Sequence, residues 1–118
     1  MEFQELCARL SIDYTATLAR FSGNEGLFRR FLLRFPSDGT FAKLQAAQAA
    51  GDLTGMENSA HTLKGVSANL GLGKLQTACD QLVQAIRRGD GTAVPGLYAQ
   101  VEQDYREAAE LLATAEVR

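Results

Sequence analysis

The sequence has few of the residues that commonly build a metal or redox site. It contains one histidine, two cysteines, two prolines and no tryptophan. Cys7 and Cys79 lie far apart in the chain, so we expect no disulfide framework; packing thiols in a reducing cytoplasm fit better. Zinc and iron sites need three or four ligands, which one histidine and two distant cysteines do not supply. We therefore expect no metal bound by this chain.

Long hydrophobic runs and an excess of one charge are also absent. No apolar stretch approaches the roughly 18 residues of a transmembrane helix. The N-terminal segment Met1–Glu5 lacks the basic and apolar regions of a signal peptide. The formal net charge is −2, so no overall basic field attracts nucleic acid or an anionic membrane. We expect a cytoplasmic protein that neither inserts into a membrane nor binds nucleic acid.

What the sequence does contain is a helical pattern along most of its length. No segment alternates apolar and polar residues over a useful length, which argues against a sheet. The 118 residues suffice for one domain with a single core. Amphipathic helices joined by short loops bury their apolar sides most simply as an antiparallel bundle. We predict an all-α, antiparallel up-down-up-down four-helix bundle with one or two short additional N-terminal helices.

Capping and breaking residues locate the helix ends. Ser11 or Asp13 is expected to cap the second helix, and Asp52 to cap the helix that contains the histidine. Gly71 suits a left-handed helix stop. Pro36 allows two interpretations, either two helices or one helix with a kink. Residues expected to face the core include Phe3, Leu6, Cys7, Ile12, Ala16, Phe21, Phe28, Phe31, Leu32, Phe35, Phe41, Leu44, Leu75, Ala78, Leu82, Val101, Ala108 and Leu112.

The only histidine, His61, lies on the polar side of its helix. At about 100° per residue, it falls roughly opposite the centre of an apolar stripe, so its imidazole should face water. By position alone, a solitary surface histidine is most often only a solvated side chain. The apolar stripe consists of Met56, Ala60, Leu63, Val66 and Leu70.

Charged and small residues surround His61 on its own side. Glu57 lies one turn before it, Lys64 and Gly65 one turn after, and Ala68 two turns after. Glycine within a helix costs about 1 kcal/mol relative to alanine, so Gly65 should have a compensating reason. The candidates are a close helix neighbour and a docking partner, and the position beside His61 favours the partner.

The segment His61–Gly71 resembles the phosphorylation motif of histidine phosphotransfer (HPt) domains of two-component phosphorelays. It reads HTLKGVSANLG, and the motif is histidine, any residue, apolar, lysine, glycine, small residues, then apolar and glycine. Flanking segments extend the resemblance to about residues 12–112. It implies an HPt four-helix bundle domain at residues 12–118, preceded by an N-terminal helical extension or connector at residues 1–11.

The resemblance also implies a function. His61 would accept a phosphoryl group on Nε2 from a receiver-domain aspartyl phosphate and pass it to a receiver aspartate, with Lys64 stabilising a phosphoryl oxygen. The domain, expected as a monomer, would be a phosphate carrier, not an enzyme with turnover of its own. Its partners would be receiver (response-regulator) domains or a hybrid sensor kinase. Mg²⁺ would come from the receiver, with no cofactor bound by this domain. Docking would involve Glu57, Asn58, Gly65, Ala68 and Asn69.

One position departs from the family pattern. Many members carry a glutamate or glutamine on the following helix, after an apolar residue, that hydrogen-bonds the nearer imidazole nitrogen. If Leu82 is that apolar residue, the position falls on Val83, which has no polar group. Asp80, Gln84, Glu57 or water would have to substitute.

Three alternatives stay open. A binding-only bundle would dock a receiver or kinase without phosphotransfer, and Val83 is consistent with it. A histidine-nucleophile hydrolase using Glu57 would need an oxyanion pocket, which an exposed helix face offers poorly. A phosphotransfer domain of a chemotaxis-type kinase would take its phosphoryl group from ATP on a separate catalytic domain.

Overall fold

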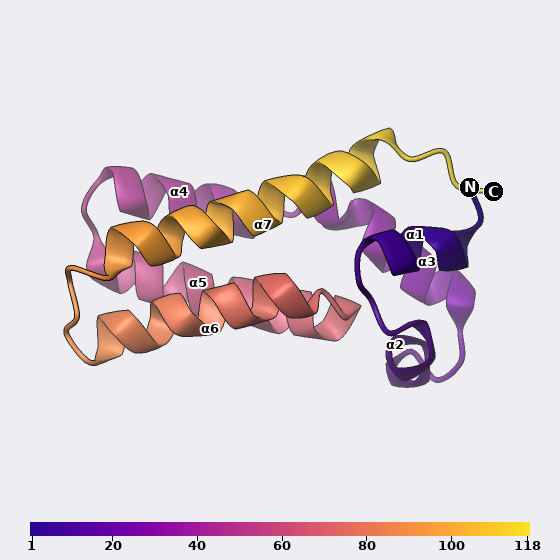
Figure 1. Cartoon of the computed structure of the whole chain (residues 1–118), viewed down its shortest axis with the longest axis horizontal. Helices are drawn as coiled ribbons and strands as arrows, with labels where there is room; N and C mark the ends of the chain where they lie inside the picture. Colours follow the sequence, from indigo (N-terminus) through magenta and orange to yellow (C-terminus); the bar gives the residue numbers. More distant parts are fainter.

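The computed structural model describes all residues from 1 to 118, which form helices and no strand. Helices α4 to α7 make an elongated bundle in which successive helices run in opposite directions, and α1 to α3 pack at one end of it (Figure 1). The predicted all-α helical bundle is confirmed. In chain order the elements are α1 (Phe3–Arg9), α2 (Tyr14–Arg20), α3 (Glu25–Arg34), the 3-10 turn η1 (Phe35–Ser37), α4 (Thr40–Ala49), α5 (Leu53–Leu70), α6 (Gly73–Arg87) and α7 (Val94–Thr114).

Pro36 separates two helices and does not merely kink one. α3 ends at Arg34, the 3-10 turn contains Pro36, and α4 begins at Thr40. The Thr40 backbone N–H donates to Asp38 Oδ1 at 2.8 Å, so the new start is held locally. Three helices, α1 to α3, therefore precede the four helices of the bundle, where one or two were predicted.

The expected N-terminal caps of α2 and α5 are present, and Asn24 caps α3 in the same way. Asp13, Asn24 and Asp52 each accept a hydrogen bond from the backbone N–H three residues further on, which satisfies a donor that the helix itself leaves free. Of the two candidates for the start of α2, Asp13 is the cap. Ser11 instead lies in the connection before it, with a φ of 56°.

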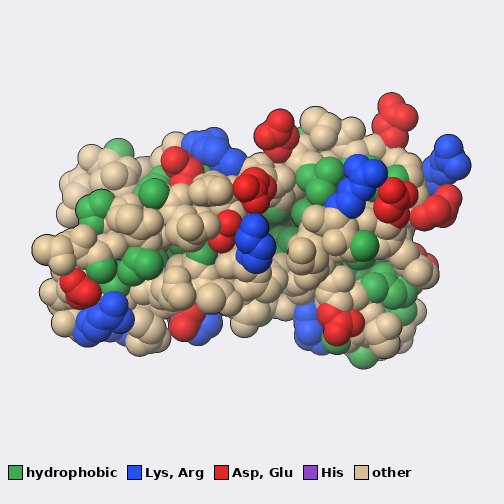
Figure 2. Space-filling model, in the orientation of Figure 1, with side chains coloured by type: hydrophobic (Ala, Val, Ile, Leu, Met, Phe, Trp, Pro, Cys, Tyr) green, Lys and Arg blue, Asp and Glu red, His purple; other side chains and the backbone are tan.

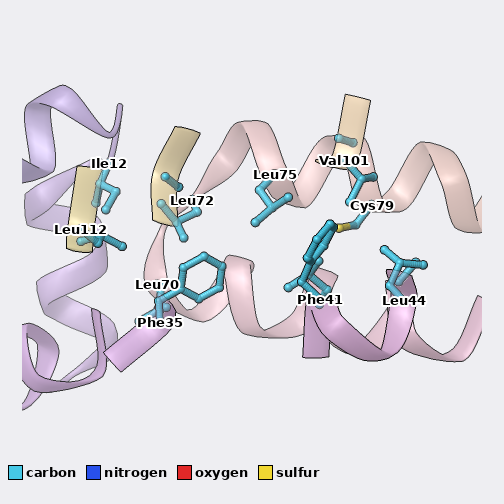
Figure 3. Close-up of a cluster of buried hydrophobic side chains, with 14 of the residues drawn as sticks. Ile12, Phe35, Phe41, Leu44, Leu70, Leu72, Leu75, Cys79, Val101 and Leu112 are labelled. Atoms are coloured by element: carbon cyan, nitrogen blue, oxygen red, sulfur yellow. The ribbon is translucent and has the colours of Figure 1, made fainter. Parts of the chain in front are cut away.

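One hydrophobic core of 26 buried residues runs through the bundle and into the N-terminal helices. Phe41 of α4 stacks on Tyr105 of α7 with ring centroids 4.2 Å apart, so these two helices meet through aromatic side chains. Figure 3 shows Phe41, Cys79 and Val101 directed from three different helices into the same space. Phe3, Leu6 and Cys7 of α1 belong to this cluster too.

Two core predictions are wrong, and three polar or charged residues take buried positions. Ala16 is exposed, and Phe31 keeps 46% of its surface accessible, while Thr17, Ser67 and Asp104 are buried. The hydroxyl of Ser67 donates to the carbonyl of Leu63 at 2.7 Å. A serine satisfied by its own helix can be buried at little cost, which the apolar pattern of the sequence does not reveal.

The surface over α6 and α7 carries side chains of both charge signs and shows no histidine (Figure 2). Lys74 of α6 lies 3.8 Å from Asp104 and 3.4 Å from Glu107 of α7, so ion pairs connect the two helices. None of the helices is both long enough and apolar enough to cross a membrane. His61 lies elsewhere on the molecule.

Gly71 fixes where α5 ends against the N-terminal helices. Its φ is +77°, and a Cβ there would overlap Thr17 Oγ1 and lie 3.0 Å from Ile12 Cγ2. The N–H of Leu72 donates to the carbonyl of Ser67 at 2.9 Å, a bond typical of a glycine helix stop. The end of the histidine helix is therefore packed tightly on α2.

We predict that Gly71→Ala lowers the free energy of unfolding by about 3 kcal/mol or more, because it adds a clash to the cost of a left-handed alanine. Gly89→Ala is the matched control, since Gly89 has a φ of +73° but open space around a Cβ; its cost should be about 1 kcal/mol. Urea unfolding of both variants measures the difference. Equal losses would contradict the close contact with α2.

Both thiols should be unreactive in the folded protein. Cys7 and Cys79 are free and buried, and desolvation by burial raises the pKa of Cys7 to about 11 and that of Cys79 to about 12. Because the thiolate is the reactive form, an aromatic disulfide reagent at pH 8 should label neither cysteine until denaturant is added, and then both. Rapid labelling of the folded chain would contradict the described core.

Candidate functional site

The helix phase of α5 places His61 at the surface. Asp52 caps the helix through a 2.9 Å hydrogen bond from the Gly55 N–H, and Gly71 ends it. The predicted stripe faces the core, with Val66 half-buried and Met56, Ala60, Leu63 and Leu70 fully buried. His61 is exposed, as its angular position predicted.

Two ion pairs connect α5 and α6 on either side of His61. Lys64 Nζ lies 2.9 Å from Asp80 Oδ1, and Arg87 Nε lies 3.3 Å from Glu57 Oε2. The partners follow one another in opposite order along the two helices, so α5 and α6 are antiparallel here. Along the axis of α5, His61 lies between the two ion pairs.

No hydrogen bond from the chain orients the imidazole. None of the side-chain hydrogen bonds near the site involves His61. Val83, where the family pattern has a polar group, is 1% exposed and lies in the core. The substitutes considered from the sequence bond elsewhere: Asp80 and Glu57 accept from the two cations, and Gln84 Nε2 donates to Asp80 Oδ1 at 3.5 Å.

Small and polar residues leave the helix surface beside His61 open. Gly65 is exposed, and a Cβ at this position would meet nothing within 4 Å. The first reason offered for this glycine, a close helix neighbour, is therefore wrong. The other residues expected to dock a partner lie along the same helix: Asn58 and Asn69 are exposed, and Glu57 and Ala68 are half-buried.

The ammonium of Lys64 is bound to α6. The hydrogen bond from Lys64, and after it the one from Gln84, holds the pKa of the Asp80 carboxyl below its usual value. Near neutral pH the carboxylate is therefore charged and the pair is formed. The Lys64 side chain is 35% exposed and that of Asp80 is 42% exposed, so both reach solvent at the edge of the site. No three His, Cys, Asp or Glu side chains lie close enough together to hold a metal ion.

The sequence interpretation missed both cross-helix pairs. It considered Asp80 only as a substitute for orienting the ring and assigned no partner to Lys64 or Glu57. A signal was available, because the family spacing sets His61 opposite Val83. Counting outward in opposite directions from these two positions brings Glu57 level with Arg87, and Lys64 level with Asp80.

Comparison with known families identifies this fold and site together. A family profile described as the Hpt domain matches residues 32–112, which include α4 to α6, most of α7, His61 and both ion pairs. No curated protein and no solved structure shows a significant match to the chain. The matched segment is more than half of the 118 residues. The chain therefore belongs to the Hpt domain family of helical bundles, phosphocarrier modules with a histidine phosphotransfer role in two-component signalling.

Proposed function

We propose that this domain is a phosphorelay intermediate that carries the phosphoryl group on His61. The observation that carries the proposal is the position of the chain's single histidine on the exposed side of α5, one turn from an open Gly65. The family supports a phosphotransfer role, and the donor and acceptor we propose are aspartates of receiver domains. We expect the domain to act as a cytoplasmic monomer.

The chemistry needs a free nitrogen lone pair and neutralised charge. A neutral imidazole offers its Nε2 lone pair near pH 7. The Nε2–P bond forms as the aspartyl O–P bond breaks, and that bond's electron pair leaves with the receiver carboxylate. In-line transfer of this kind depends on placement and charge stabilisation more than on further covalent chemistry. The receiver's acidic site would supply Mg²⁺, and Lys64 would bind a phosphoryl oxygen.

The proposed docking surface is the exposed side of α5. Asn58 and Asn69 offer polar groups near its two ends. Gly65 and Ala68 have little or no side chain, so the receiver's active-site loops can approach the ring between them. Glu57 adds a carboxylate already paired with Arg87. Such a surface positions a partner around His61 without enclosing it, which suits transfer between two proteins.

A second candidate is a bundle that docks a receiver or kinase without transfer. Two observations favour it: no hydrogen bond of the chain holds the imidazole, and the Lys64 ammonium is engaged by Asp80. Receiver binding with no phosphoryl group transferred, under conditions where a known phosphorelay pair reacts, would select this function.

We expect the parent domain to take up one phosphoryl group when mixed with a phosphorylated receiver and Mg²⁺. The product should be labile in acid and stable in base, as phosphoramidates are, and His61→Gln should accept none. Radiolabel transfer resolved by electrophoresis measures both. Uptake by His61→Gln equal to that of the parent would exclude His61 as the acceptor.

Gly65→Ala should change stability and docking in opposite directions. Because nothing opposes a Cβ at Gly65, alanine should raise the free energy of unfolding by about 0.5–1 kcal/mol. The added methyl group faces the partner, so the rate of transfer from the receiver should fall. Gly96→Ala in α7 is the control: it too has open space, lies outside the proposed docking surface, and should leave transfer unchanged. Unaltered transfer by Gly65→Ala would show that this position makes no close contact with the receiver.

A further inference from the structure

We propose that Asp80 is a positioning residue of the phosphotransfer, which holds the Lys64 ammonium on α6 and competes with the phosphoryl group for it. The inference rests on the proposed function. It assigns a role to a carboxylate on α6, one turn before the position where the family pattern has its polar residue.

The geometry of the pair carries this step. Lys64 Nζ approaches Asp80 Oδ1 to 2.9 Å, the length of a strong charge-assisted hydrogen bond. Gln84 donates to the same oxygen at 3.5 Å, so the carboxylate is held from two sides. These two hydrogen bonds fix the position of the Asp80 carboxylate. Lys64, whose ammonium the carboxylate binds, lies one helical turn from His61 along α5.

The position of the pair argues against a purely structural role. Exposed ion pairs contribute little to stability, and both side chains are over one-third exposed. The domain has comparable pairs within single helices, such as Arg9 with Glu5 at 3.1 Å. The Lys64–Asp80 and Arg87–Glu57 pairs instead cross between α5 and α6 on either side of the proposed phosphoryl acceptor. Of these two, only Lys64–Asp80 contains the ammonium that the proposed transfer uses.

The charges at the site determine how Asp80 would affect phosphotransfer. A phosphoryl group on His61 brings a charge of about −1.5 to −2 next to an ammonium that Asp80 already neutralises. Either the ammonium leaves the carboxylate or two anions share it. In both cases Asp80 weakens the hold of Lys64 on the phosphoryl group, which keeps phosphorylated His61 a ready donor to the next receiver.

The test compares the parent with Asp80→Asn, Asp80→Glu, Lys64→Met and the double variant Asp80→Asn/Lys64→Met. Glu5→Gln is the control, since it removes one carboxylate from an exposed ion pair in α1. Two quantities are measured: the equilibrium distribution of the phosphoryl group between His61 and a receiver, and the pH titration of the phosphoryl group by phosphorus NMR after labelling with the small-molecule donor phosphoramidate. Thermal unfolding of each variant accompanies them.

Asp80→Asn should shift the distribution toward phosphorylated His61 by about two- to fivefold, the range expected for an exposed ion pair. The freed ammonium should also lower the phosphoryl pKa by about 0.3–0.7, because a cation favours the more highly charged form. Asp80→Glu and Glu5→Gln should resemble the parent, and the unfolding midpoints should stay similar. In the Lys64→Met background, Asp80→Asn should have no effect.

The role of Asp80 would be overturned if Asp80→Asn left both the phosphoryl distribution and the phosphoryl titration unchanged. It would also be overturned if Asp80→Asn changed them equally in the Lys64→Met background. If phosphoramidate labels His61 but no receiver does, the proposed function fails, and the titration still decides whether Asp80 controls Lys64. Failure of both donors to label His61 would overturn both proposals.

Discussion

The packing of α5 against α6 is the interaction on which the site depends. α5 buries Met56, Ala60 and Leu63, and this fixes the rotation of the helix about its own axis. Once that rotation is set, His61 has to face outward, and Lys64 has to lie at the edge shared with α6. The site is thus built on a helix that the core holds in place, which positions reacting groups more accurately than a loop does.

The same constraint separates Gly71, which the fold requires, from Gly65, which it does not. Gly71 is required where it is, because its backbone conformation and the contact with Thr17 exclude a side chain. Gly65 in the same helix has no such requirement, and it costs about 1 kcal/mol of helix stability relative to alanine. A glycine that lowers helix stability and has open space where a side chain would stand fits the proposed docking surface.

Features that depend on a single helix could be predicted from the sequence, whereas features that depend on how two helices pack could not. The exposure of His61 followed from the phase of a single helix, and Gly71 and Asp52 followed from local backbone needs. Phe31 was wrongly expected in the core, because its exposure depends on how α3 packs on the other helices and not on the phase of α3 alone. The partner of Lys64 depends on the register between α5 and α6, which residue periodicity alone does not define.

Val83 shows how packing shapes the chemistry of the site. Its side chain points into the core, where a polar group would need a buried hydrogen-bond partner. Valine removes that requirement, and it also removes the group that would hold the imidazole of His61. If His61 is the phosphoryl acceptor, as proposed, the loss of side-chain freedom needed to fix the ring falls on the encounter with the receiver and not on the folding of the domain. In the proposed transfer, a correctly docked partner therefore has to orient the ring as well as deliver the phosphoryl group, so accurate docking matters more here than in a domain with a preset ring.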